Sequence, residues 1–306
     1  MAKLAALTQP QLESWAMQAR TKVQSGQLPQ HIPLLSSPDR IHQFAVQVRQ
    51  TDGQSFSVER ESHQFPLMSL IKPFVLLYLL QQVGSDRVFQ KVNLQPSEYP
   101  FNSLAQLEID QFKPRNPMIN SGALVLAELL PGKTASSRCQ RLNDWLNQLA
   151  NSQLTFDPIM LQSIQAFPNP INQAIAHGLN QAGYLEDIQT TLDTYQQICC
   201  LSGTVEDLTK LGTLLAQPQT EIESNYQKIV NALMLTCGLY ETSSRYAVQI
   251  GLPIKSGISG GLLAVIPRVG AIACYSPPLD RAGNSVAGLF LLEQLTQTLN
   301  LSIFSI

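Results

Sequence analysis

The stretch "GLPIKSGISGGLLAVIPRVGAIACYS", residues 251–276, contains two short apolar runs that decide the class of fold. The runs "GLLAVIP" and "GAIACYS" are rich in strand-favouring residues and are joined across Arg268, Val269 and Gly270. We therefore predict a β-hairpin close to the carboxy terminus. The lysine and serine of "IKSG" stand just before this hairpin.

A second hairpin is predicted near the other end of the chain. In residues 43–49 apolar side chains recur at every second position and so share one face of an extended chain. Another short alternation follows the Thr-Asp-Gly sequence at 51–53. A period of two is typical of strands, and a turn with glycine between two such runs indicates a hairpin. The apolar members of the two runs are Phe44, Val46, Val48, Phe56 and Val58.

The segments between the hairpins have helical spacing. Several of them, including "SGALVLAELL" and "VEDLTKLGTLLAQ", repeat apolar residues near the 3.6-residue period of a helix. This arrangement predicts an α+β fold, in which both chain ends share one antiparallel sheet flanked by helices and the middle forms a helical lobe. We expect one domain over residues 1–306, with a sheet lobe at about 30–75 and 235–306 and a helical lobe at about 76–234. The polar loops "QPSEYPFNS" and "QFKPRNPMIN" are expected to line a cleft between the lobes.

The composition argues against several classes of function. The chain has 306 residues, of which 44% are hydrophobic and 14% charged, so it is able to bury a large core. A formal net charge of -2 without a basic stripe argues against nucleic-acid binding and favours a small-molecule partner. The longest apolar run, residues 67–80, includes Lys72 and Pro73 and is shorter than the roughly 20 residues of a membrane span. We expect a core helix there, and no association with a membrane.

The cysteines and histidines point to neither a disulfide framework nor a metal site. The five cysteines are an odd set without a C-x-x-C pair, and the amino terminus lacks a recognisable signal peptide. Reduced thiols and a cytoplasmic location are therefore expected. The four histidines are scattered, with no H-E-x-x-H or comparable ligand pair, so we predict no metal.

The segment "FPLMSLIKPFVLL", residues 65–77, places Ser69 three residues before Lys72 in an otherwise apolar run. If a helix begins near Ser69, Lys72 lies one turn later on the same face, and its amine is able to reach the serine hydroxyl. Pro73 is tolerated because the first turn of a helix has free N–H groups. Burial lowers the pKa of a lysine, and a neutral amine is able to take a proton from serine.

Lys255-Ser256-Gly257 changes the weight of this pattern. An S-x-x-K sequence alone occurs by chance about once in a chain of this size, and its alternative meaning is a capping serine beside a lysine that extends to solvent. With K-S-G before the final hairpin, a nucleophilic serine becomes the favoured interpretation. The combination is the pattern of serine β-lactamases and penicillin-binding proteins.

Longer blocks of sequence resemble the serine-dependent glutaminase family. They are "KPRNPMINSGAL", "GLPIKSGISGGLLAVIP", "YSPPLDRAGNSVAG", "FPLMSLIK" and "CGLY", and the match extends from about Gly26 to the carboxy terminus. The resemblance implies a β-lactamase-like fold, a soluble enzyme without a cofactor, and a homotetramer or homodimer. It also implies hydrolysis of L-glutamine to L-glutamate and ammonia through a glutamyl-serine intermediate.

The resemblance further implies roles for individual catalytic residues. Ser69 matches the nucleophile and Lys72 its general base. Ile258 occupies the position of a valine whose backbone N–H, with that of Ser69, forms the oxyanion hole. Lys255 is expected to support the electrostatics of the serine and lysine pair. Lys72, Tyr240 or Tyr195 protonates the departing ammonia, and the sequence does not choose among them.

Four further residues match groups that contact the substrate. Asn120 and Asn172 match substrate-binding asparagines, and Tyr195 and Tyr240 match tyrosines that contact substrate and shuttle protons. Each has a structural alternative, because a tyrosine on an amphipathic segment is often a core residue and Asn120 stands where an asparagine commonly caps a helix.

Two positions depart from the family pattern. Gln165 stands where the family has a glutamate that holds the substrate's α-ammonium, and His31 replaces a tyrosine at the pocket rim. Loss of a partly buried ion pair predicts weaker binding by on the order of 2–4 kcal/mol, unless Glu186 or another acid compensates. The alternatives left open are a related serine amidase, an inactive binding homologue and a penicillin-type hydrolase.

Overall fold

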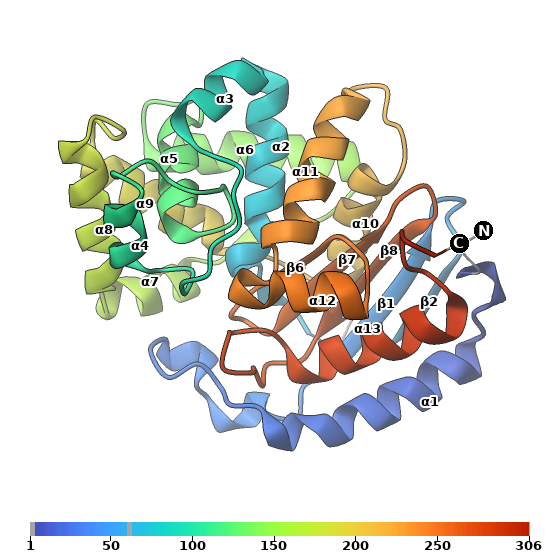
Figure 1. Cartoon of the computed structure of the whole chain (residues 1–306). Helices are drawn as coiled ribbons and strands as arrows, with labels where there is room; N and C mark the ends of the chain where they lie inside the picture. Colours follow the sequence, from blue (N-terminus) through green and yellow to red (C-terminus); the bar gives the residue numbers. More distant parts are fainter. Residues whose placement is uncertain (1–3, 60–62, 306) are drawn as a thin grey trace.

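Five antiparallel strands from the two ends of the chain form the main sheet (Figure 1). The computed structural model describes residues 4–59 and 63–305. The strands are β1 (Ala45–Gln50), β2 (Ser55–Val58), β6 (Ile254–Ser256), β7 (Gly261–Ile266) and β8 (Gly270–Tyr275), in the order β2-β1-β8-β7-β6. Both predicted hairpins are present, and β1 from the first pairs along its length with β8 from the second. The prediction that the two chain ends share one antiparallel sheet is confirmed.

A second, smaller sheet was not predicted from the sequence. Its order is β3-β5-β4, and its strands are β3 (Phe65–Pro66), β5 (Leu201–Gly203) and β4 (Thr155–Phe156). Strands of two or three residues are too short to show an alternating pattern. This sheet joins the segment before Ser69 to the middle of the chain, because Phe65 pairs with Gly203 and Pro66 with Ser202.

Helices surround the main sheet and form the rest of the molecule. The α-helices are α1 (Gln9–Arg20), α2 (Lys72–Val83), α3 (Ser85–Lys91), α4 (Leu104–Ile109), α5 (Asn120–Leu129), α6 (Ala135–Ala150), α7 (Pro158–Ala166), α8 (Pro170–Gln181), α9 (Ile188–Cys199), α10 (Val205–Ala216), α11 (Ser224–Cys237), α12 (Ser243–Gln249) and α13 (Val286–Leu299). Short 3-10 helices cover Leu4–Ala6, Thr21–Ser25, Pro33–Leu35, Pro38–Arg40, Met68–Ile71 and Tyr240–Thr242.

The main sheet is covered on both faces. Helices α1 and α13 pack on one face, and α10 packs on the other against β1, β7 and β8 (Figure 1). We call the sheet with these three helices and α12 the sheet lobe, and α2 to α9 with α11 the helical lobe. Helix α10 thus belongs to the sheet lobe by its contacts, whereas the sequence pattern assigned its residues to the helical lobe. The amphipathic α1 lies before the predicted start of the sheet lobe.

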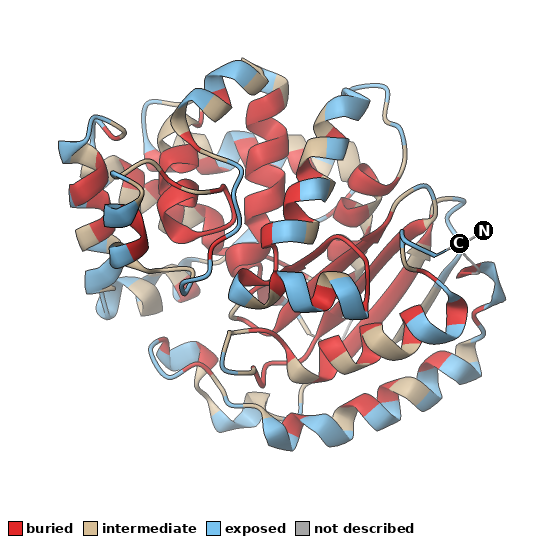
Figure 2. Cartoon of the chain, viewed as in Figure 1, coloured by how far each residue is buried: buried red, intermediate tan, exposed pale blue. Residues whose placement is uncertain are grey.

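Burial on both faces explains the composition of the central strands. Every residue of β7 and β8 is buried (Figure 2). Leu263 and Val265 of β7 belong to the core shared with the helical lobe, whereas Leu262 and Ala264 face α1 and α13. A strand without a solvent face reads as a continuous apolar run, which is the pattern of "GLLAVI". In β1, Val46 and Val48 share the side that faces α1 and α13, as their alternation predicts.

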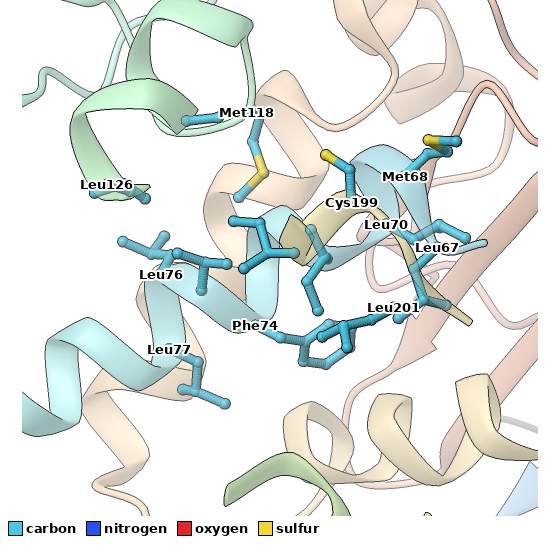
Figure 3. Close-up of a cluster of buried hydrophobic side chains, with 14 of the residues drawn as sticks. Leu67, Met68, Leu70, Phe74, Leu76, Leu77, Met118, Leu126, Cys199 and Leu201 are labelled. Atoms are coloured by element: carbon cyan, nitrogen blue, oxygen red, sulfur yellow. The ribbon is translucent and has the colours of Figure 1, made fainter. Parts of the chain in front are cut away.

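The segment around Ser69 enters the core as a short 3-10 helix that continues into α2. Met68 to Ile71 form the 3-10 turn, and Pro73 is the second residue of α2, where its missing N–H costs no helical bond. Figure 3 shows Leu67, Leu70 and Phe74 packed with Leu201 of β5. Because every residue from Lys72 to Leu80 is buried, α2 is the central helix of the helical lobe.

Two further expectations concern membranes and thiols. Within residues 4–59 and 63–305, no helix is both long and apolar enough to cross a bilayer. All five cysteines are free and buried.

Truncation of Phe74 tests the role of this cluster. Phe74 is fully buried, so Phe74→Ala is expected to lower the free energy of unfolding by about 3–5 kcal/mol. The matched control is Phe304→Ala, because Phe304 is 62% exposed and its loss is expected to cost less than about 0.5 kcal/mol. Urea unfolding followed by circular dichroism measures both values. Equal losses in the two variants would contradict the packing described for α2.

Candidate active site

A cavity of about 360 Å³ opens between the two lobes. The sheet lobe contributes Ile258, and the helical lobe contributes residues of α7, α8 and α9 to its wall. Phe101, from the predicted loop "QPSEYPFNS", also lies in the wall. The predicted site residues in the wall are His31, Ser69, Asn120, Gln165, Asn172, Tyr195 and Ile258. The predicted residues Lys72, Tyr240 and Lys255 are buried behind the wall. Lys72 contacts Asn120, Tyr240 interacts with Ser69, and Lys255 lies against the Tyr240 ring.

Lys72 is buried among neutral groups. Its side chain is 2% exposed, and Nζ donates hydrogen bonds to the Met118 carbonyl at 3.2 Å and to Asn120 Oδ1 at 2.9 Å. Within the described part of the chain, Lys72 forms no ion pair with a carboxylate. Burial lowers the pKa of Lys72 to about 8, while the nearby Cys199 thiol has a smaller, opposite effect. A large fraction of this lysine is therefore neutral near pH 8.

Ser69 lies one helical turn from Lys72, in the 3-10 helix that leads into α2. It is buried, and its side chain interacts with the Tyr240 hydroxyl. Among the described residues, no hydrogen bond joins Ser69 Oγ to Lys72 Nζ, whose partners are instead Met118 and Asn120. The direct contact predicted from S-x-x-K is not made in this arrangement.

Asn120 connects three of the predicted residues. Its Oδ1 accepts from Lys72 Nζ and, at 3.2 Å, from the Tyr195 hydroxyl, while its Nδ2 donates to Asn172 Oδ1 at 2.9 Å. The capping alternative for Asn120 is wrong, because Ile119 is the N-cap of α5 and the Asn120 side chain forms no cap bond. Asn116 supports this turn instead, by accepting from the Met118 and Ile119 amides.

Lys255 lies behind Tyr240, on the short strand β6. It is fully buried, and Nζ donates to the Gly238 carbonyl at 3.1 Å and to the Ser256 carbonyl at 2.7 Å. Nζ is 4.4 Å from the centre of the Tyr240 ring, a cation–π distance when the amine is charged. Burial, and then repulsion from Lys72, hold the pKa of Lys255 well below its ordinary value.

Tyr240 and Tyr195 are buried but retain partners for their hydroxyls. Tyr240 donates to the Ser256 carbonyl at 3.1 Å, and Tyr195 donates to Asn120. Burial raises the pKa of both phenols, so each stays protonated at neutral pH. Tyr240 and Met68 also have positive φ angles of 58° and 49°, which non-glycine residues seldom adopt outside functional or turn positions.

The backbone N–H groups of Ser69 and Ile258 have no hydrogen-bond partners among the described residues. Both residues line the cavity. Gly257 allows the two segments to approach, since a Cβ at this position would lie 2.8 Å from the Leu67 carbonyl oxygen. A pair of free N–H groups at the nucleophile is the arrangement that stabilises an oxyanion.

Gln165 and His31 both lie at the rim of the cavity. Gln165 lies in the wall, but its side chain is exposed, and His31 is likewise exposed at the wall. The penalty of about 2–4 kcal/mol expected for a glutamine at 165 stays a prediction. Desolvation by neighbouring atoms lowers the pKa of the His31 imidazole, although much of its surface is exposed.

Helix α9 contributes five of the wall residues that the sequence did not identify. Glu186, named as a compensating acid, precedes α9, is exposed and does not belong to the wall. Asp193 does belong to it. The spacing along α9 was the available signal, because positions 189, 192 and 193, 196 and 199 follow one helical face that passes beside Tyr195. The wall residues missed on α9 are Gln189, Leu192, Asp193, Gln196 and Cys199.

Known proteins resemble this chain over nearly its whole length. A family model described as Glutaminase matches residues 26–304. A glutaminase of Synechocystis sp. (strain ATCC 27184 / PCC 6803 / Kazusa) is 44% identical over 299 residues, which are 97% of this chain and 91% of that protein. Glutaminase 2 of Bacillus subtilis (strain 168) is 33% identical over 304 residues, covering 96% of this chain and 98% of the relative.

Solved structures agree with the sequence relatives. The covalent complex between the Bacillus subtilis glutaminase YbgJ and 5-oxo-L-norleucine has a TM-score of 0.86 and is 29% identical, covering 97% of this chain and 99% of that one. A structure described as the probable glutaminase ybaS has a TM-score of 0.88 and is 33% identical, covering 98% of this chain and 100% of the other. The β-lactamase-like fold expected from the sequence is therefore confirmed.

Replacement of Lys255 tests whether its burial opposes folding. Its folded-state pKa is below the ordinary value of 10.5, so the unfolded chain binds more protons and the free energy of unfolding rises with pH up to about that value. Lys255→Met removes this contribution, while the Ser256 and Gly238 carbonyls keep Tyr240 and the Ser256 amide as donors. We expect the variant to unfold at a higher temperature at pH 7, with a smaller rise in stability between pH 7 and 10.

The same variant is expected to lose about tenfold or more in turnover, because Tyr240 loses its neighbour. The exposed Lys133 offers a matched control, and Lys133→Met should change neither property. Calorimetric melting across the pH range and assays of turnover measure the two effects. A Lys255→Met protein that melts lower at pH 7 with wild-type turnover would contradict this account of Lys255.

Proposed function

The chain belongs to the glutaminase family, and from this premise we propose that Ser69 and Lys72 carry out its hydrolysis of L-glutamine to L-glutamate and ammonia. The observation that carries the proposal is the buried Lys72 amine, held by neutral partners one helical turn from a serine in the cavity wall. With its pKa lowered to about 8, a fraction of this amine is neutral at physiological pH, and that fraction is able to act as a base.

The first step is attack by Ser69. A neutral amine at Lys72 keeps two N–H donors for the Met118 carbonyl and Asn120 Oδ1, and its lone pair is then free to accept a proton. As Lys72 takes the proton from Ser69, Oγ forms a bond to the side-chain amide carbon of L-glutamine. The C=O electrons move onto oxygen, and the oxyanion accepts hydrogen bonds from the Ser69 and Ile258 amides.

Collapse of this intermediate releases ammonia. The leaving nitrogen must gain a proton, and Lys72 holds the one it removed from Ser69. Lys72 is a stronger acid than either tyrosine, because its pKa is about 8 while burial raises the pKa of Tyr195 and Tyr240. We therefore assign protonation of ammonia to Lys72 and a relay or hydrogen-bonding role to Tyr240. Water then attacks the γ-glutamyl ester with Lys72 again as base, which releases L-glutamate and restores Ser69.

Substrate contacts are proposed along the same wall. Asn120, Asn172 and Tyr195 already share hydrogen bonds, so their polar groups are held in place before glutamine enters. Gln165 and His31 are proposed at the outer end of the substrate, and Lys255 acts through Tyr240 without touching the reacting atoms.

We further propose that residues 1–306 work as a single catalytic domain, in a cytoplasmic homodimer or homotetramer. Five free, buried thiols are consistent with a reducing compartment. Val248 on α12 is an apolar side chain that is 88% exposed and available for association. Light scattering of the purified protein measures the oligomeric state, and a monomer at all concentrations would refute that part of the proposal.

Removal of the nucleophile tests the assignment of Ser69. Ammonia release should be greatest with L-glutamine in a comparison with asparagine and related amides, and Ser69→Ala should reduce it by at least about 1,000-fold. Coupled ammonia assays measure the rates, and circular dichroism checks the fold of the variant. Preferred hydrolysis of another amide would favour the related amidase that Gln165 left open. Covalent labelling of Ser69 by a fluorescent penicillin would favour the penicillin-type hydrolase.

The pH dependence tests the role of Lys72. Because the neutral amine is the active form, kcat/KM is expected to rise with pH and to level off above about 8, with a tenfold change per unit on the acidic side. The same limb should appear with glutaramate, which is glutamine without its α-amino group, since the limb belongs to the enzyme. Lys72→Arg should lose about 100-fold or more at every pH, because a guanidinium stays charged. A profile that is flat between pH 6 and 9 would exclude Lys72 as the base.

A further inference from the structure

Asp193 provides the negative charge of the cavity. Its side chain is half-buried, and in the part of the wall formed by described residues it is the one carboxylate. L-glutamine is a zwitterion at neutral pH, and its α-ammonium is attached to the carbon three carbon–carbon bonds from the amide carbon that Ser69 attacks. We propose that Asp193 binds this α-ammonium and so determines the preference for α-amino acids, an inference that rests on the proposed function.

The position of Asp193 on α9 fits this role. Gln189, Asp193 and Gln196 follow one face of the helix from its exposed first turn toward the buried Cys199, and all four belong to the cavity wall. Two residues after Asp193, Tyr195 donates its hydroxyl hydrogen to Asn120, within the group of residues proposed for the reaction. Asp193 thus lies nearer the mouth than the reacting centre, where the outer end of a substrate with its amide at Ser69 would be.

The Asp193 carboxylate is available to a cation. Oδ1 accepts one hydrogen bond, from Gln189 Nε2 at 2.8 Å. Among the described residues, Asp193 forms no ion pair, and its second oxygen has no hydrogen-bond donor. A neutral amide orients the carboxylate without cancelling its charge. A half-buried anion held in this way binds an ammonium more strongly than an exposed one, because water screens it less.

Three acids outside the cavity wall already have structural roles. Asp187 caps α9 through the Thr190 amide, and Asp157 caps α7 through the Met160 amide. Asp280 braces a turn by accepting from the Ala282 and Asn284 amides. These carboxylates are committed to the backbone, so the recognition of a substrate cation falls to Asp193.

A comparison of two substrates isolates this contact. L-glutamine carries the α-ammonium and glutaramate lacks it, so the ratio of their kcat/KM values reports the contribution of the cation. Asp193→Asn is expected to lower kcat/KM for L-glutamine by about 10- to 100-fold, mainly through KM, and to change the value for glutaramate much less. The matched control is Glu186→Gln, which makes the same change in charge at an exposed acid outside the wall. It should leave both values unchanged.

Two further readouts separate recognition from a structural effect. The acidic limb of the pH profile should stay near pH 8 in Asp193→Asn, because Asp193 is not among the groups that shift the pKa of Lys72. Gln165→Glu, made in the Asp193→Asn background, places a carboxylate elsewhere in the wall and should restore part of the preference for L-glutamine. Equal losses with both substrates, or a wild-type ratio in Asp193→Asn, would overturn the proposal while leaving the glutaminase assignment intact.

Binding measurements keep the inference independent of turnover. Calorimetry with Ser69→Ala should detect tighter binding of L-glutamine than of glutaramate, and Asp193→Asn in that background should remove the difference. If wild-type protein released no ammonia from L-glutamine, the proposed function would fail, but the same titrations would still decide whether Asp193 recognises an α-ammonium. Equal affinities for the two ligands in Ser69→Ala would refute the role of Asp193.

Discussion

The arrangement of the site depends on a lysine amine buried without a counter-ion. Lys72 is surrounded by a carbonyl, an amide oxygen and aromatic or apolar side chains, so its charged form has little to compensate for lost hydration. A carboxylate among its partners would stabilise the ammonium and remove the base at neutral pH. The complete burial of α2 is therefore a condition for the chemistry as well as for the stability of the core.

Lys72 in turn affects a second buried lysine. Lys255 approaches from the opposite lobe, and the charge of Lys72 adds to burial in lowering the pKa of Lys255. The Tyr240 ring and two carbonyls hold Lys255 in position, and the Tyr240 hydroxyl is directed to one of those carbonyls. The sheet thus influences the nucleophile through Tyr240, whose backbone has the positive φ that this placement requires.

Much of the architecture was predictable because it depends on local patterns. The alternation of Val46 and Val48, the apolar runs of β7 and β8 and the Ser69 to Lys72 spacing all survive in the fold. The placement of α10 against the sheet was not predictable, because the sequence of an amphipathic helix shows which of its faces is buried but not which surface that face packs on. Nor was the partner of Lys72, because Asn120 is 48 residues away in sequence and only tertiary packing brings it there. Asp193 was missed for a related reason: a single acid on a helix usually belongs to a solvated face.

The two free amides at the nucleophile come from segments of different lobes. Ser69 precedes α2, the central helix of the helical lobe, whereas Ile258 follows β6, an edge strand of the sheet lobe. The proposed oxyanion site consequently exists only while the two lobes are docked. A chain that has formed its secondary structure but has not docked its two lobes would be inactive. The appearance of activity during refolding would therefore report lobe docking.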